Sequence, residues 1–68
     1  MPVISMTMGA GQATPQQKKE LIETFTESAA KITGIQAKAF TILIHELSED
    51  SIGVGGRTLE EMKAAMAG

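Results

Sequence analysis

The residue best suited to do chemistry is the proline that follows the initiator methionine. A small second residue normally allows removal of Met1, which would leave Pro2 with a free secondary amine. An ordinary α-amino group titrates at about 7.7 to 8.0, and partial burial beside apolar side chains lowers its pKa further. Abstraction of a proton next to a carbonyl requires such a base. Pro2 is therefore a candidate general base, although many proteins begin with Met-Pro for no catalytic reason.

Two other side chains allow more than one interpretation. Histidine titrates near neutrality, so His45 is a candidate acid or base, but a histidine at a strand end beside Glu46 is more often a hydrogen-bonded interface residue. Arg57 is the only arginine and follows a glycine-rich stretch, from which it could reach a neighbouring subunit's site. A solvated charge or an intersubunit ion pair is the alternative. Lys18 and Lys19 are typical of a solvated helix face.

The elements that position these residues follow from periodicity. Residues 3 to 8 alternate with period two, placing Ile4, Met6 and Met8 on one face, which predicts a half-buried strand ending at a glycine-rich turn. A helix is predicted over residues 15 to 33, because Thr14 and Gln17 form a capping box around Pro15 and Gly34 can end it. Its apolar side, assigned to the core rather than to a cofactor, comprises Leu21, Ile22, Phe25, Ala29 and Ile32.

The remainder predicts a βαβ unit with a C-terminal extension. Residues 39 to 46 are rich in β-branched and apolar residues, which favours a second strand, covered on both faces and parallel to the first. Residues 51 to 57 favour a hairpin arm, and residues 58 to 66 a short terminal helix. The predicted fold class is α+β, with residues 1 to 68 forming a single domain.

Length and composition narrow the possible partners. A chain of 68 residues buries only about 60% of its unfolded surface, and it has neither cysteines nor a metal-binding cluster to compensate. Two strands also leave sheet edges open, so we expect a homo-oligomer to complete the sheet. A net charge of −2 without a basic cluster makes nucleic acid an unlikely partner. No bilayer span or signal peptide is apparent, so we expect a cytoplasmic protein without a membrane partner.

From Pro2 to about Met62, the chain resembles the 4-oxalocrotonate tautomerase family. The resemblance rests on Pro-Val-Ile at the start, Gly11, Gln-Lys-Lys-Glu-Leu-Ile at 17 to 22, Ile-Leu-Ile-His-Glu at 42 to 46, and Gly-Val-Gly-Gly at 53 to 56. It implies a tautomerase-like fold assembled as a dimer or a trimer of dimers. It also implies enol-keto proton transfer by Pro2 on a small 2-hydroxydienoate or 2-keto acid such as 2-hydroxymuconate, without cofactor or metal.

The resemblance also suggests which residues bind substrate. The best-known members use two arginines and a phenylalanine, whose positions fall here near Gln12 or Ala13, on Thr41 and on Ile52. We therefore expect the substrate-binding residues to be Gln12, Thr41, Ile52 and Arg57. Gln12 and Thr41 can offer only neutral hydrogen bonds, which are weaker than the charged, bidentate hydrogen bonds that an arginine donates to a carboxylate. The alternatives are a non-catalytic oligomeric scaffold and a hydratase- or dehalogenase-like enzyme of the same fold.

Overall fold

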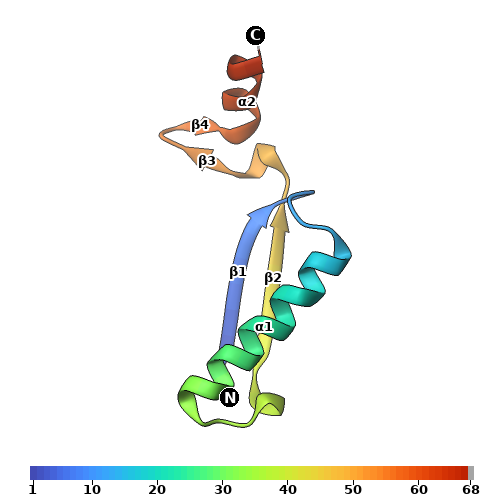
Figure 1. The fold of residues 1–68 in the computed structure, drawn as a ribbon. Coiled ribbons are helices and arrows are strands. Elements are labelled where there is room, and N and C mark those ends of the chain that lie inside the picture. The colour runs from blue at the N-terminus through green and yellow to red at the C-terminus, as the bar shows by residue number, and fades with distance from the viewer. Residues whose placement is uncertain (68) are drawn as a thin grey trace.

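In a computed structural model, which describes residues 1–67, a βαβ unit is followed by a small C-terminal unit (Figure 1). The βαβ unit contains β1 (Val3–Gly9), α1 (Pro15–Thr33) and β2 (Thr41–Leu47). The C-terminal unit contains β3 (Gly53–Val54), β4 (Arg57–Thr58) and α2 (Leu59–Ala67). Short 3₁₀ turns at Ala37–Ala39 and Glu49–Ser51 precede β2 and β3. The predicted βαβ unit with parallel strands and a C-terminal hairpin is confirmed.

The two long strands pair in parallel over their whole length, from Val3 opposite Thr41 to Gly9 opposite Leu47. The second strand begins at Thr41 rather than at residue 39, because the chain first makes a 3₁₀ turn in which the Phe40 N–H donates to the Ala37 carbonyl (3.1 Å). The ladder between the strands starts only after this turn.

Local signals fix both ends of α1. The Thr14 hydroxyl accepts a hydrogen bond from the Gln17 N–H (3.1 Å), and the Gln17 side chain accepts one from the Thr14 N–H (2.9 Å). Gly34 adopts a left-handed φ of 76° and donates its N–H to the Ala30 carbonyl (2.9 Å). The helix therefore has the predicted bounds, set by a capping box and a glycine C-cap.

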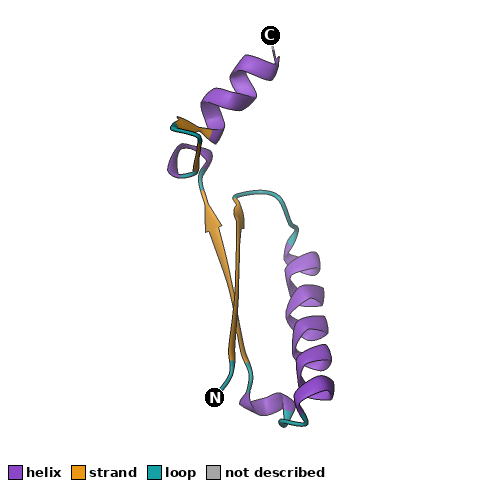
Figure 2. Cartoon of the chain, turned by 90° about the vertical axis from the view of Figure 1, so that its left-hand side faces the viewer, coloured by secondary structure: helices purple, strands orange, loops and turns teal. Residues whose placement is uncertain are grey.

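Helix α1 covers one face of the two-stranded sheet and leaves the other face open (Figure 2). On the covered side, Met8 is the most buried apolar side chain of the described residues, at 9% exposed. On the open face Val3 and Leu43 are 49% and 41% exposed, so the expected cover on both faces of β2 is absent from the single chain. Ile32, assigned to the core, is 84% exposed, which corrects that prediction.

The C-terminal unit projects beyond the end of the sheet (Figure 1). Gly55 and Gly56 have φ values of 61° and 86°, as a two-residue type I′ hairpin turn requires. Thr58 caps α2 by accepting a hydrogen bond from the Glu61 N–H (3.0 Å), so this helix begins at Leu59 rather than at residue 58. An ion pair between Lys63 and Glu49 fastens α2 to the turn before the arm.

The chain is too extended for a globule of its size. Its radius of gyration is 15.7 Å and its extents are 49 × 24 × 15 Å, whereas a compact domain of this length has a radius of gyration of about 11 Å. Its accessible surface is 5036 Å², which exceeds the roughly 4,100 Å² expected for its mass by about 900 Å². The excess lies in an uncovered sheet face and a projecting arm.

Candidate active site

The candidate base lies where the sheet begins. Pro2 is half-buried, and its carbonyl accepts a hydrogen bond from the Thr41 N–H (3.0 Å). Thr41 lies opposite Val3 in the register, so its side chain belongs to the face that α1 leaves open. Met1 is 93% exposed. The structure therefore brings Pro2 and Thr41 together, next to the exposed Met1.

The other predicted site residues lie at the opposite end of the sheet. Gln12 follows the C-terminal end of β1, which is about 20 Å from its first residue at the usual rise per residue of a strand. Ile52 is half-buried and precedes β3, and Arg57 is exposed in β4, both beyond the C-terminal end of β2. Within one chain, Pro2 and Thr41 therefore lie at one end of the sheet, and the other three predicted residues lie at the opposite end.

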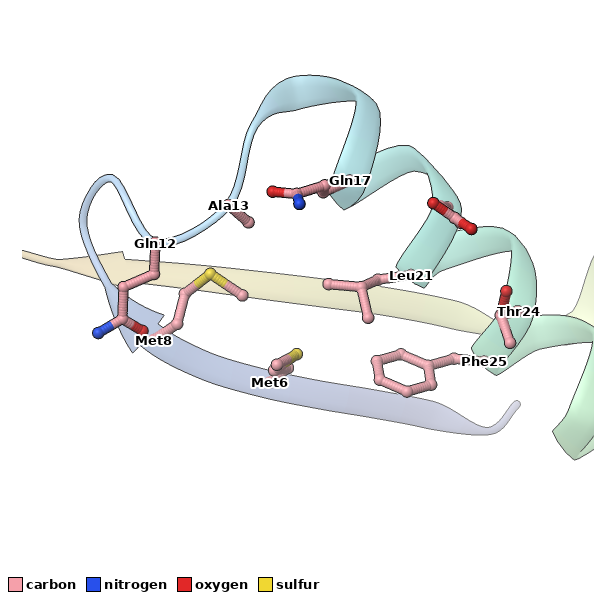
Figure 3. A pocket seen from close by; sticks show the side chains of 9 residues that line it. Met6, Met8, Gln12, Ala13, Gln17, Leu21, Thr24 and Phe25 are labelled. Atoms are coloured by element: carbon pink, nitrogen blue, oxygen red, sulfur yellow. The ribbon is translucent and has the colours of Figure 1, made fainter.

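A groove with a volume of about 490 Å³ runs between β1 and α1 (Figure 3). Its floor is apolar and its rim is polar. Glu20 is the one charged residue among those that line it. Phe25, which was assigned to the core, lines this groove and is half-buried. The lining residues are Met6, Met8, Gln12, Ala13, Gln17, Glu20, Leu21, Thr24 and Phe25.

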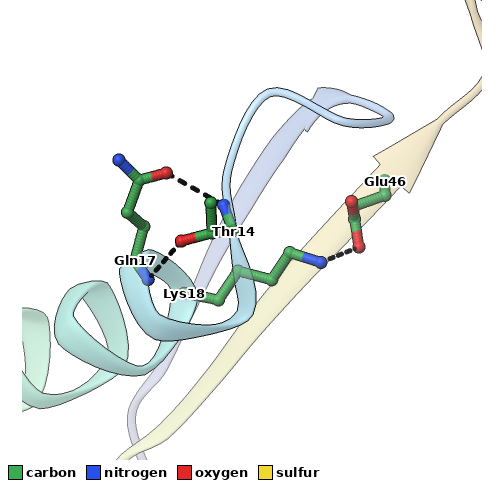
Figure 4. Close-up of polar contacts among 4 residues, drawn as sticks. All are labelled: Thr14, Gln17, Lys18 and Glu46. Atoms are coloured by element: carbon green, nitrogen blue, oxygen red, sulfur yellow. Dashed lines mark hydrogen bonds and ion pairs between the residues drawn. The ribbon is translucent and has the colours of Figure 1, made fainter.

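Near one end of the groove, Lys18 and Glu46 join the first turns of α1 to the end of β2 (Figure 4). The Lys18 ammonium lies 2.5 Å from the Glu46 carboxylate. The hydrogen bond from Lys18 is the main cause that lowers the pKa of Glu46; desolvation opposes it, and the Lys18 charge and a backbone hydrogen bond from Gly11 add to it. Of the two lysines predicted on a solvated helix face, Lys19 is 69% exposed, whereas Lys18 is 27% exposed and pairs with Glu46. The spacing in sequence, 28 residues, gave no local signal for the pair.

His45 is exposed on the open face, opposite Thr7 in the register. Its predicted role as an interface residue remains a prediction, as does a catalytic role. Within residues 1–67, no group of three or more histidine, cysteine, aspartate or glutamate side chains could hold a metal ion. None of the helices in the same range is long and apolar enough to span a bilayer.

Comparison with known proteins gives the family. A family model described as tautomerase enzyme matches residues 2–62, so the chain belongs to that family. The 2-hydroxymuconate tautomerase of Bacillus subtilis (strain 168) is 32% identical over 63 residues, which cover 93% of this chain and 100% of the relative. The predicted resemblance to 4-oxalocrotonate tautomerases is confirmed.

Solved structures agree with this assignment. A 4-oxalocrotonate tautomerase isozyme from Methylibium petroleiphilum has a TM-score of 0.87 at 30% identity, covering 94% of this chain and 98% of that one. A heterohexamer 4-oxalocrotonate tautomerase from Chloroflexus aurantiacus J-10-fl has a TM-score of 0.82 at 26% identity, covering 91% and 98%. A structure described in terms of trans-3-chloroacrylic acid dehalogenase activity has a TM-score of 0.74 at 28% identity, covering 85% and 98%. Members of this fold thus differ in reaction and assembly.

Proposed function

We propose that this protein is an isomerase that transfers a proton between the enol and keto forms of a small 2-hydroxydienoate or 2-keto acid, with Pro2 as general base. The observation that carries the proposal is the position of Pro2, which is half-buried directly before β1, beside Thr41, with the exposed Met1 on its N-terminal side. Membership of the tautomerase family and the 2-hydroxymuconate activity named for the Bacillus subtilis relative support it.

The proposed reaction balances without an added reagent. The Pro2 nitrogen takes the proton of the substrate's 2-hydroxyl group, and the oxygen's electron pair forms the carbonyl while the diene shifts. The nitrogen then returns the proton to a diene carbon. Because the substrate supplies all the electrons, the step needs neither metal nor redox cofactor. The negative charge that develops on the substrate oxygen requires hydrogen-bond donors nearby.

We propose that these donors come from a second subunit. The outer edge of β1 pairs with no other strand of residues 1–67 and borders the groove. A two-fold axis pairs identical strand edges antiparallel. Full overlap of two β1 strands would set Val3 opposite Gly9 of the other copy, so that Pro2 of each copy would lie beside Ala10 of the other. Pro2 and Gln12, which one chain separates, would then share a site.

The size of the uncovered surface supports this assembly. The excess of about 900 Å² is similar to the roughly 800 Å² per partner that a stable interface buries. The open face with Val3 and Leu43 would be covered by further copies, as in a trimer of dimers. We propose that the arm packs on a neighbouring subunit, where Ile52 and Arg57 would help to close the site around Pro2 and Thr41.

The test is an assay of the Met-processed protein with 2-hydroxymuconate and phenylenolpyruvate, following the loss of enol absorbance. We expect turnover above the buffer rate, and a lower rate for Pro2→Ala, whose primary amine differs in basicity and geometry. A rate equal to that of buffer for the processed oligomer would refute the isomerase proposal and favour an oligomeric scaffold.

A second candidate function is dehalogenation or hydration of a small unsaturated acid. The structural relative connected with trans-3-chloroacrylic acid dehalogenase activity favours it. Chloride release from trans-3-chloroacrylate, measured with the same preparation, separates the two reactions. Release of chloride at a rate above the enol turnover would make dehalogenation the principal activity.

A further inference from the structure

The arm is held in one conformation by contacts at its base. The Leu59 N–H donates to the Ile52 carbonyl (2.8 Å), which extends the pairing between β3 and β4. The Thr58 N–H and hydroxyl group both donate to the Glu61 carboxylate (2.9 Å each). Because these contacts fix both strands of the hairpin, Arg57 lies on a defined backbone beside the turn.

One face of the arm is apolar apart from a single cation. Val54 lies opposite Arg57 in the register of the hairpin, so their side chains share a face. Ile52 has an extended backbone (φ −114°, ψ 125°), and the alternation of a strand puts its side chain on the same face as Val54. Val54 is 55% exposed, so its own chain leaves this face uncovered. Such a face suits a neighbouring surface that is apolar and binds an anion at its edge.

No carboxylate of the described residues neutralises the arginine on this face. The basic residues that form ion pairs with glutamates are Lys18, Lys19 and Lys63. Within residues 1–67, no carboxylate pairs with Arg57, nor with Lys31 in the last turn of α1 or Lys38 in the 3₁₀ turn before β2. Of these three, only the arginine has the planar fork that donates two parallel hydrogen bonds to a carboxylate. Arg57 is therefore the cation best suited to bind an anionic substrate group.

In the proposed assembly, the arm of one subunit lies beside the base of another. The arm projects beyond the C-terminal end of the sheet (Figure 1), whereas Pro2 and Thr41 lie at the N-terminal end. The two ends are about 20 Å apart, which is longer than an arginine side chain. Antiparallel pairing of two β1 strands sets the C-terminal end of one sheet beside the N-terminal end of the other. Arg57 therefore reaches Pro2 of a neighbouring subunit but not Pro2 of its own chain.

We propose that Arg57 binds the substrate's carboxylate in the active site of a neighbouring subunit, so that each site takes its base from one chain and its cation from another. The inference rests on the proposed function, because it concerns the substrate of the same site. The carboxylate of a 2-hydroxydienoate is attached to the carbon that bears the reacting hydroxyl group. A guanidinium that binds this carboxylate through two hydrogen bonds orients the hydroxyl group toward the Pro2 nitrogen. Gln12 and Thr41 then donate neutral hydrogen bonds to the oxygen on which charge develops.

The first test removes the charge from each side of this contact. The substrates are phenylenolpyruvate and the enol of its methyl ester, which lacks the carboxylate charge. Arg57→Gln should lower kcat/KM for the acid by about 10- to 100-fold, as expected for hydrogen bonds to a charged group. It should change kcat/KM for the ester by less than about twofold, since the guanidinium has no charged partner there. Arg57→Lys should give an intermediate loss for the acid, because the charge remains and the planar fork does not.

Lys38→Gln is the matched control, because it removes the same charge from the turn at the Pro2 end of the sheet. It should change the ratio of kcat/KM for the acid to kcat/KM for the ester by less than about threefold. A merely structural defect would lower kcat/KM for both substrates by the same factor. Circular dichroism and sedimentation check that each variant folds and assembles.

The second test asks whether Arg57 acts on a neighbouring chain. Chains that retain Met1 lack the base, and processed Arg57→Gln chains lack the cation. Equal amounts of the two are unfolded together and refolded, which forms sites that combine Pro2 of one chain with Arg57 of the other. Random mixing gives both groups to about a quarter of the sites, so the mixture should recover about a quarter of the unaltered rate. The same oligomers mixed without unfolding are the control.

The outcomes separate this inference from the proposed function. An unchanged kcat/KM for the acid in Arg57→Gln, or equal losses for acid and ester, would overturn the inference and leave the isomerase proposal standing. A larger effect of Lys38→Gln on the ratio would also overturn it, because the cation would then come from the turn before β2. Absence of recovery in the refolded mixture would contradict the supply of Arg57 by a second chain. Turnover of neither substrate by the unaltered oligomer would refute the proposed function, and this inference with it.

Discussion

Retention of Met1 should abolish the activity without disturbing the fold. With Met1 attached, the Pro2 nitrogen belongs to an amide and has no basic lone pair. The Met1 side chain is 93% exposed, and the hydrogen bond at Pro2 uses its carbonyl rather than its nitrogen. Loss of Met1 therefore removes almost no packing, so a difference in rate between the two forms reports the base alone. A positioned general base contributes about 10² to 10⁴ in rate, and we expect a difference of that order.

The measurement uses two chemically synthesised chains, with and without Met1, whose intact masses are verified before assay. Loss of enol absorbance is followed across pH, and the rate of the processed form should rise as the terminal amine loses its proton. Thermal unfolding and sedimentation provide the control, since both should agree between the two forms. Equal rates above buffer would refute the reasoning, because another group would then be the base. His45 would be the first to replace.

Three predictions concern stability and assembly. Leu43→Asp would bury an unpaired charge on the open sheet face when the subunits assemble, at a penalty of about 3 to 5 kcal/mol. Sedimentation should therefore show the dissociation constant of the assembly rising by about 10² to 10⁴. The control is Gln16→Asp at an exposed position of α1, which should leave the assembly intact. Thr14→Ala removes the cap of α1 and should reduce the free energy of unfolding by about 1 kcal/mol in urea titrations. The pKa of Glu46 is lowered from 4.5, so the stability that this carboxylate contributes is present above that value and is lost as the pH falls through its lower folded value. Acid titration followed by circular dichroism should therefore show a smaller loss below pH 4.5 in Lys18→Met than in the unaltered sequence.

Each of these predictions has a contrary outcome. A stable folded monomer of the unaltered sequence at micromolar concentration would contradict the assembly. An unchanged urea midpoint for Thr14→Ala would show that tertiary packing alone holds the start of α1. Identical acid titrations with and without Lys18 would show that the ion pair does not persist in solution.

The elements of the fold could be predicted because their signals are local. Thr14, Gln17 and Gly34 cap α1 with neighbours at most four residues away, and alternation along β1 identified its covered face. The start of β2 was placed two residues early, because Ala39 and Phe40 continue the apolar run of the strand while the backbone there completes a 3₁₀ turn. Ile32 continues the apolar stripe of α1, but the sheet of a single chain leaves it 84% exposed.

Sequence by itself determined the βαβ order, the ends of α1, the parallel pairing and the family, since these depend on periodicity, capping and matched motifs along the chain. Tertiary structure alone decided that Thr41 lies beside Pro2 and that Lys18 meets Glu46. These contacts depend on how α1 crosses the sheet, and a pair separated by 28 residues leaves no local pattern. The sequence shows which chemical groups are present, and the packing of the helix against the strands determines which of them come into contact.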